Sequence, residues 1–284
     1  MLVKELEVLT MSIFNHLKLN WHFINKCNMQ CKFCYSSKES CSDITFDMIP
    51  KIKPFKEINL VGGEPTIYGK YIYLLERLHS QGHILSIVSN GAMFLRDNNI
   101  FNKTIKYCET IGLSIDSINN ETCINIGRKL HNQKTVSEEE YLYICKKIKD
   151  SGRLLKINTV VNRFNYKENL NSFIEKIKPD KWKIFQVLPI NNLNPCEDLL
   201  ITKKEFNYFL ANHSNCKNIM YIENNNLMTS SYIMLDSKGR FFNNINNKYV
   251  YSKSLIYDNV NLEEEFLKMK YDISKYSDRY IKNK

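Results

Sequence analysis

Long apolar runs are absent from this sequence of 284 residues. No stretch approaches the about 18 apolar residues in a row that a membrane-spanning helix needs. The first fourteen residues carry two glutamates and no small-residue cleavage site, so they do not resemble a signal peptide. We therefore expect a cytoplasmic protein that is not attached to a membrane.

Glycine and proline are also few, at 9 and 6 residues, and no stretch rich in them divides the chain. No internal repeat of solenoid length occurs. With 43% hydrophobic and 25% charged residues, the composition excludes a disordered or collagen-like chain. These features predict one globular domain with a sizeable core and a C-terminal extension.

Arginine is scarce, so the formal net charge of +10 comes almost entirely from lysine. A basic chain favours anionic partners such as nucleotides, nucleic acid or acidic surfaces. The same charge can serve solubility alone, and composition does not decide between the two.

Nine cysteines are many for an intracellular chain, and three of them fall between positions 27 and 34. A disulfide framework usually has an even number of cysteines in a short secreted chain. The uneven spacing therefore favours a metal or redox site at Cys27, Cys31 and Cys34. The remaining cysteines are expected to behave as small hydrophobic residues: Cys41, Cys108, Cys123, Cys145, Cys196 and Cys216.

Segments rich in β-forming residues alternate with helical patterns up to about residue 212. The expected strands are 17–23, 57–61, 83–88, 112–115, 154–161 and 183–188. Between them, residues 71–78 show one apolar helical face, and Ser137 with Glu140 forms a capping-box pattern ahead of another helix. Six β-then-α units predict an α/β fold with a parallel sheet, a partial (β/α)6 TIM-type barrel.

The pattern changes after residue 212. Residues 231–236 and 240–243 flank Ser-Lys-Gly, which predicts a β-hairpin, and a short acidic helix start follows at 263–265. The predicted organisation is an N-terminal segment at 1–16, a barrel core at 17–212 and a C-terminal extension at 213–284.

The cysteine cluster reads Cys27-Asn-Met-Gln-Cys31-Lys-Phe-Cys34 and follows the first expected strand. Three thiolates can bind three irons of a [4Fe-4S] cluster and leave the fourth iron without a protein ligand. An open position serves chemistry, whereas structural metal sites are closed. The alternative is a zinc site with His22 or a distant cysteine as fourth ligand, although zinc usually takes paired Cys-x2-Cys knuckles.

The second expected strand ends in Gly62-Gly63-Glu64-Pro65. A glycine pair lets a ligand approach the backbone closely, and the carboxylate can hold an ammonium group. Polar side chains also stand at the ends of the third and fourth strands, at Ser89, Asn90 and Ser114. Serine and asparagine cap turns everywhere, so each of these three indicates little by itself.

Together, the Cys-x3-Cys-x-Phe-Cys motif and the Gly-Gly-Glu-Pro turn resemble the radical SAM superfamily. Within it, the chain is similar to the viperin family from about residue 17 to residue 257. The segments that carry this closer resemblance are 20–23, 86–91, 114–117, 126–128, 156–165, 181–186, 231–236 and 252–256.

The resemblance implies a lyase with two cofactors, a [4Fe-4S] cluster and S-adenosylmethionine. Viperins dehydrate a ribonucleoside triphosphate, typically CTP, to its 3′-deoxy-3′,4′-didehydro form, and a 5′-deoxyadenosyl radical takes the hydrogen from C4′. The product lacks a 3′-hydroxyl and can terminate a growing RNA chain, which implies an antiviral role. UTP and GTP stay open as substrates.

The resemblance also implies ligand-binding residues. It places S-adenosylmethionine against Phe33, Tyr35, Gly62, Gly63, Glu64, Ser89, Asn90, Ser114, Arg128 and Asn158. It places the triphosphate against Lys38, Lys156, Lys181 and Lys183. The family has arginine in place of Lys181, and arginine offers bidentate contacts where lysine offers a point charge. This departure is expected to weaken one phosphate contact.

Tyr232 matches the family tyrosine that relays the final proton. The alternative is a half-buried strand tyrosine. The amphipathic membrane helix and the C-terminal tryptophan of animal viperins find no match here. We expect a monomer that takes electrons from a donor such as flavodoxin or ferredoxin, and whose C-terminal extension closes over the nucleotide.

Three other classes of protein are alternatives. A nucleic-acid-binding protein lacks support, because the sequence has no helix-turn-helix or zinc knuckle and the Gly-Gly-Glu-Pro turn would be unexplained. A cluster-bearing scaffold is the second. A radical SAM enzyme acting on a peptide or another small molecule is the third, but such enzymes usually carry a second cysteine cluster. Toward the C-terminal end only Cys196 and Cys216 stand, twenty residues apart.

Overall fold

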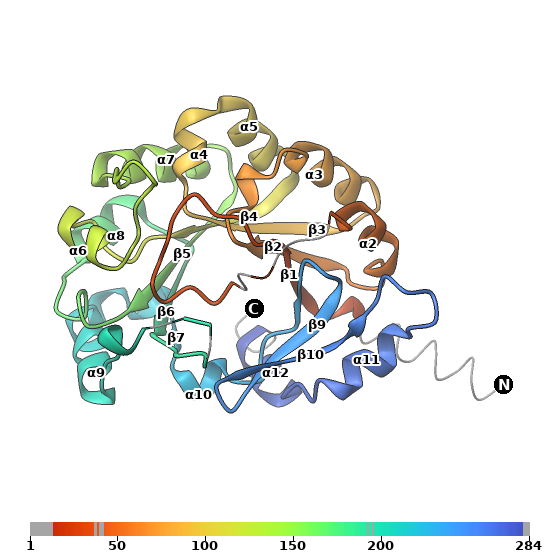
Figure 1. Ribbon diagram of the computed structural model, residues 1–284. Coiled ribbons are helices and arrows are strands. Elements are labelled where there is room, and N and C mark those ends of the chain that lie inside the picture. Colours follow the sequence, from red (N-terminus) through yellow and green to blue (C-terminus); the bar gives the residue numbers. More distant parts are fainter. Residues whose placement is uncertain (1–13, 37–38, 40–42, 192, 195, 281–284) are drawn as a thin grey trace. The chain divides into compact units, whose positions relative to one another are not determined.

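The computed structural model describes residues 14–36, 39, 43–191, 193–194 and 196–280 of the chain (Figure 1). The chain divides into two compact units. The terminal unit comprises Met1–Lys26, Ser36–Ser86 and Leu227–Lys284, and the central unit comprises Cys27–Tyr35 and Ile87–Asn226.

The terminal unit is built around strand β1. Its strands are β1 (Lys18–Ile24), β2 (Glu57–Gly62), β8 (Met234–Leu235), β9 (Arg240–Ile245) and β10 (Lys248–Ser254). β1 pairs in parallel with β2 and with β8, and β8, β9 and β10 are antiparallel neighbours. The helices are α2 (Thr45–Lys51), the 3-10 turn η1 (Pro65–Ile67), α3 (Tyr71–Ser80), α11 (Leu262–Lys268) and α12 (Ile273–Tyr280).

The central unit contains a parallel run of strands. These are β4 (Cys108–Ser114), β5 (Leu154–Val161), β6 (Lys181–Gln186) and β7 (Met220–Glu223), each paired with the next. The helices are α4 (Ala92–Arg96), α5 (Asn98–Tyr107), α6 (Asn120–Asn125), α7 (Glu138–Asp150), α8 (Asn171–Ile177), α9 (Lys203–Asn212), η2 (Glu197–Leu199) and η3 (Ser214–Ile219). β3 (Ile84–Ser89) leads from the terminal unit into this one, and α10 (Asn225–Met228) leads back.

Helix α7 starts where its capping pattern predicts. The Ser137 hydroxyl accepts the Glu140 N–H, and the Glu140 carboxylate accepts the Ser137 N–H, so two N–H groups of the first turn are satisfied. Tyr141, Ile144, Cys145 and Ile148 then follow at helical spacing and are buried. The helix therefore has one apolar face, which it buries.

The two faces of strand β6 differ in chemistry. Trp182 is fully buried, its indole N–H donates to the Thr159 hydroxyl at 2.9 Å, and its ring meets Phe209 of α9 edge-on. Because side chains alternate along a strand, Lys181 and Lys183 point to the opposite face. Helix packing thus covers one face of the strand and leaves the lysines on the other.

The core of the terminal unit is aromatic. Phe241 of β9 packs against Phe55 and Phe266 at ring separations of 6.2 and 5.8 Å, and Phe14 meets the same two rings at 5.1 Å. Edge-to-face pairs of this kind add stability beyond the burial of their area. Phe14 and Phe266 stand near opposite ends of the chain, so this core joins its first and last described parts.

The predicted fold class is confirmed, since the parallel β/α repeats are those of a partial TIM-type barrel core. All six expected strands form, and the sixth begins at Lys181 rather than at Lys183. The hairpin forms as β8 and β9, and the acidic helix as α11. β7 was not predicted, because four residues in an Asn-rich stretch give too little pattern. The division at residues 16/17 and 212/213 stays a prediction.

None of the helices in the described ranges is long and apolar enough to cross a membrane.

Candidate active site

The cysteine loop of the central unit is fastened along its middle. The N–H of Gln30 donates to the Gly127 carbonyl at 3.3 Å, and the N–H of Lys32 donates to the Ile126 carbonyl at 3.1 Å. Gly127 has a φ of +78°, and a Cβ there would lie 2.2 Å from the Gln30 carbonyl oxygen. Only glycine fits this position, because the backbone of the cysteine loop lies directly against the backbone of residues 126–128.

Arg128 holds the loop from its side-chain face. Its Nε donates to Asp116 Oδ2 at 2.7 Å, its Nη2 contacts the same oxygen, and its guanidinium lies 5.6 Å from the centre of the Phe33 ring. Phe33 itself is 3% exposed and packs in the core with Ile126 and Val160. The expected contact of Phe33 and Arg128 with the cofactor stays a prediction, whereas their contact with each other is observed.

The three thiols are half-buried. Burial raises the pKa of the Cys31 thiol to about 12, and the nearby Arg128 guanidinium opposes that rise. The Met29 N–H donates to Cys27 Sγ at 3.4 Å, which favours the thiolate that iron needs. In the described part of the chain, no three His, Cys, Asp or Glu side chains converge on one metal ion. A cubane cluster takes each thiolate on a different iron, whereas a zinc ion takes all of its ligands on one metal.

The Gly-Gly-Glu-Pro turn closes against the end of β1 within the terminal unit. Gly63 N–H donates to the Ile24 carbonyl at 2.7 Å, and Glu64 N–H donates to the Lys26 carbonyl at 2.9 Å. A Cβ on Gly62 would lie 2.2 Å from Ile24 O, and one on Gly63 would lie 2.0 Å from Lys26 O. The close approach that requires these glycines is therefore made by the chain's own backbone, which runs directly into Cys27.

Glu64 is buried at the end of that turn, with 1% of its surface exposed. Its Oε1 accepts the Thr66 hydroxyl at 2.5 Å and the Thr66 N–H at 3.2 Å. Both bonds fix the carboxylate in one orientation, as the site for an ammonium group requires.

Asn90 connects the end of β3 to the cysteine loop. Its Nδ2 donates to Asn28 Oδ1 at 2.7 Å, and its Oδ1 accepts the Ala92 N–H at 3.0 Å. The Ser89 hydroxyl accepts the Gly91 N–H at 3.0 Å. Both side chains therefore shape the turn into α4, and their contact with a cofactor stays a prediction.

Ser114 and Asn158 are neighbours in register at the ends of β4 and β5. Asn158 Oδ1 is buried and lacks a hydrogen-bond partner among the described residues. A buried acceptor in this state is costly unless a ligand satisfies it. An S-adenosylmethionine amine or hydroxyl is such a donor, so this position fits the cofactor.

The predicted phosphate-binding lysines share one face of the central sheet. Lys156 pairs in register with Lys181. Two residues further along each strand, Asn158 pairs with Lys183. Lys181 Nζ lies 3.8 Å from the centre of the Tyr221 ring, and Lys183 Nζ lies 2.6 Å from Glu223 Oε1. Lys38 lies outside the described residues.

Tyr221 and Glu223 were missed by sequence reasoning, because they belong to the unpredicted strand β7. Glu223 also acts on Tyr35: burial raises the pKa of the Tyr35 hydroxyl above its usual range, and the Glu223 charge adds to the rise. Tyr221 as the contact of Lys181 and Glu223 as the partner of Lys183 could have been expected only if β7 had been predicted.

In the terminal unit, Tyr232 precedes β8 and is half-buried. The next residue, Ile233, accepts the backbone N–H of Asn20 at 2.8 Å, which fixes the strand beside β1. The relay role of Tyr232 stays a prediction.

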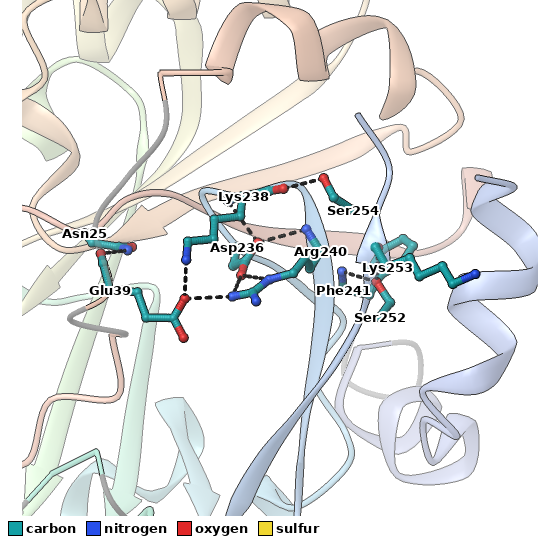
Figure 2. A network of polar contacts seen from close by, with 9 residues as sticks. All are labelled: Asn25, Glu39, Asp236, Lys238, Arg240, Phe241, Ser252, Lys253 and Ser254. Carbon is teal, nitrogen blue, oxygen red and sulfur yellow. Dashed lines mark hydrogen bonds and ion pairs between the residues drawn. The ribbon is translucent and has the colours of Figure 1, made fainter. Parts of the chain in front are cut away.

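A network that was not expected joins Glu39 to the hairpin of β8 and β9 (Figure 2). Glu39 Oε2 lies 2.6 Å from Lys238 Nζ and 3.1 Å from Arg240 Nη2, and its carbonyl accepts Asn25 Nδ2 at 2.8 Å. These cations, Lys238 first, lower the pKa of the Glu39 carboxyl. Asp236 Oδ2 accepts Arg240 Nε at 2.8 Å, so one arginine joins two carboxylates.

Comparison with known proteins shows the family of this chain. The family model described as "Radical SAM superfamily" matches residues 21–177. An S-adenosylmethionine-dependent nucleotide dehydratase from Flammeovirga pacifica is 36% identical over 276 residues, which cover 92% of this chain and 93% of that protein. A protein of the same description from Lacinutrix mariniflava is also 36% identical, over 92% of this chain and 57% of its own length.

The fold is shared with a solved structure. The crystal structure of Streptococcus suis SuiB bound to S-adenosylmethionine has a TM-score of 0.64 at 16% identity, over 96% of this chain and 71% of that chain. At this identity the likeness shows the fold alone. It agrees with the barrel core described above.

The expected superfamily, fold and cofactors, a [4Fe-4S] cluster and S-adenosylmethionine, are thus confirmed. The chain is an enzyme that belongs to the radical SAM superfamily and, within it, to the viperin-like family of S-adenosylmethionine-dependent nucleotide dehydratases.

Proposed function

We propose that this enzyme removes water from a ribonucleoside triphosphate, with CTP as the first candidate, to give the 3′-deoxy-3′,4′-didehydro nucleotide. The observation that carries the proposal is the row of lysines on one face of β5 and β6, in register with Asn158. A triphosphate needs several fixed cations, and a peptide has no such requirement. The names of the relatives from Flammeovirga and Lacinutrix agree with a nucleotide.

Different residues would bind the cluster, S-adenosylmethionine and the nucleotide. Cys27, Cys31 and Cys34 would hold the cluster, and the Glu64 carboxylate would take the amino group of S-adenosylmethionine. When bound, these two cofactors supply the one-electron chemistry that removes the hydrogen from C4′ of the ribose. Lys156 and Lys181 would bind the phosphates and so orient the ribose.

The remaining steps concern a proton and an electron. Tyr232 would hold a proton at its hydroxyl oxygen and deliver it as the product forms. The electron would come from a donor of the flavodoxin or ferredoxin kind. A product without a 3′-hydroxyl would stop RNA synthesis, which gives the enzyme an antiviral role.

The test is an anaerobic assay of the reconstituted enzyme with S-adenosylmethionine, a strong reductant and each of the four ribonucleoside triphosphates separately. Mass spectrometry should find one nucleotide that becomes lighter by one water, together with an equal amount of 5′-deoxyadenosine. If 5′-deoxyadenosine forms while all four nucleotides survive, the nucleotide substrate is wrong and a peptide or another small molecule takes its place.

A further inference from the structure

Asp116 joins three separate segments of the central unit. It is 1% exposed and lies two residues beyond the end of β4. Its Oδ2 accepts Arg128 Nε, its Oδ1 accepts the Val160 N–H of β5 at 2.7 Å, and its carbonyl accepts Asn165 Nδ2 at 2.7 Å. A carboxylate held at both oxygens has one orientation, so it can fix the group that it binds.

The group that it fixes is the Arg128 guanidinium. The arginine side chain is 11% exposed and Asp116 is fully buried, so each charge depends on the other for compensation. With Nε and Nη2 both directed to Asp116, the guanidinium carbon lies 5.6 Å from the centre of the Phe33 ring. Arginine suits this double contact because its guanidinium can donate to a carboxylate while it attracts an aromatic ring.

Phe33 is the residue before Cys34, and Cys31 packs against the hydrophobic cluster to which Phe33 belongs. The same loop is hydrogen-bonded through Gln30 and Lys32 to residues 126 and 127. Arg128 therefore adds a side-chain contact to a backbone contact, and both reach the loop between its cysteines. If the Arg128 side chain pointed elsewhere, Phe33 would lose this contact and could move. The distances between the cysteine thiolates would then change.

We propose that Asp116 is a positioning residue: it holds Arg128 against Phe33 and so fixes the loop that presents Cys27, Cys31 and Cys34 to the cluster. This inference rests on the cysteines as cluster ligands and not on the identity of the nucleotide. Outer partners of metal ligands typically change metal affinity or activity by roughly 10- to 100-fold.

The test is Asp116→Asn in the full chain, with Asp180→Asn as the matched control. Asp180 also accepts a β5 N–H, from Leu155 at 2.7 Å, and also pairs with a cation, Lys149 at 2.9 Å. We expect reconstituted Asp116→Asn to lose iron to a chelator roughly 10-fold faster than wild type. Its reduced cluster should give an altered EPR spectrum before and after S-adenosylmethionine is added, while Asp180→Asn matches wild type in both.

A purely structural role of Asp116 predicts a different result. The melting temperature would fall, while the rate of iron loss well below melting and the EPR spectra would stay as in wild type; that outcome overturns the proposal. If Asp116→Asn does not fold, Arg128→Lys replaces it, since lysine keeps the charge but cannot both pair in two places and stack. Wild-type iron loss and spectra in Arg128→Lys would likewise overturn it. Loss of nucleotide turnover alone decides neither.

Discussion

Lys183, a predicted phosphate ligand, is ion-paired with Glu223 at 2.6 Å, and the two side chains are 9% and 4% exposed. A buried charge pair is expensive to break from one side. A phosphate bound to Lys183 would have to share the ammonium group with this carboxylate. If Lys183 binds phosphate as proposed, the pair would link the stability of the protein to nucleotide binding.

Replacing the carboxylate tests that link. Glu223→Gln keeps the shape but removes the negative charge that pairs with Lys183, so we expect the free energy of unfolding to fall by roughly 3 kcal/mol. An added triphosphate would supply the missing negative charge. The rise in melting temperature caused by CTP should then be larger in Glu223→Gln than in wild type. An equal or smaller rise would mean that Lys183 does not bind phosphate.

If Tyr232 is the proton relay, its replacement should affect formation of the dehydrated nucleotide much more than formation of 5′-deoxyadenosine. Tyr232→Phe removes the hydroxyl proton and keeps the ring, so we expect formation of the dehydrated nucleotide to fall about 10²–10⁴-fold. Cleavage of S-adenosylmethionine to 5′-deoxyadenosine should stay measurable. Tyr257→Phe is the control, because Tyr257 is 62% exposed in the same unit. Full dehydration by Tyr232→Phe would remove this tyrosine from the mechanism.

The Gly-Gly-Glu-Pro turn predicts a steric effect on the backbone that leads into Cys27. In Gly63→Ala the new Cβ would meet the Lys26 carbonyl oxygen at 2.0 Å, so the residue before Cys27 must move. We expect a lower melting temperature of the apo protein and less iron bound after reconstitution. Gly69→Ala is the control, since nothing lies within 4 Å of the Cβ that it adds. If both variants bind iron like wild type, the turn does not constrain the loop.

Acid should weaken the fold through a half-buried histidine. Burial lowers the pKa of His22 from its ordinary 6.5 to about 4, so the unfolded chain takes up the proton more readily than the folded chain. The contribution of His22 is fully present above pH 6.5 and is lost as the pH falls toward 4. Its loss amounts to about 3 kcal/mol in total.

Urea unfolding of wild type and His22→Leu between pH 7.5 and 4.5 measures this contribution. The stability gap between the two proteins should shrink as the pH falls, because leucine has no proton to bind. A stability gap that stays constant with pH would show that His22 titrates alike in both states.

Patterns contained within one stretch of chain were predictable. Ser137 and Glu140 lie three residues apart and cap a helix by local hydrogen bonds. The cysteine motif and the glycine turn are local in the same sense. Each required only the residues on either side of it, and the structure contains the helix and the turn at those places.

Relationships made by the fold could not be predicted. Asp116 and Arg128 lie twelve residues apart with helix α6 between them, and no spacing rule pairs them. Glu223 lies on a strand too short to recognise, forty residues from Lys183. The contact of Gly63 with Lys26 was not predicted, because only the structure shows that the Lys26 backbone occupies the space beside this glycine.

The terminal unit also has a consequence for synthesis on the ribosome. Strand β1 takes part of its pairing from β8, and Asn20 bonds to Ile233, 213 residues later in the chain. The edge of β1 that pairs with β8 therefore stays unpaired until the ribosome has made most of the chain. The emerging chain must keep that edge from pairing with a neighbour, so its yield in a cell should depend on chaperones more than its final stability suggests.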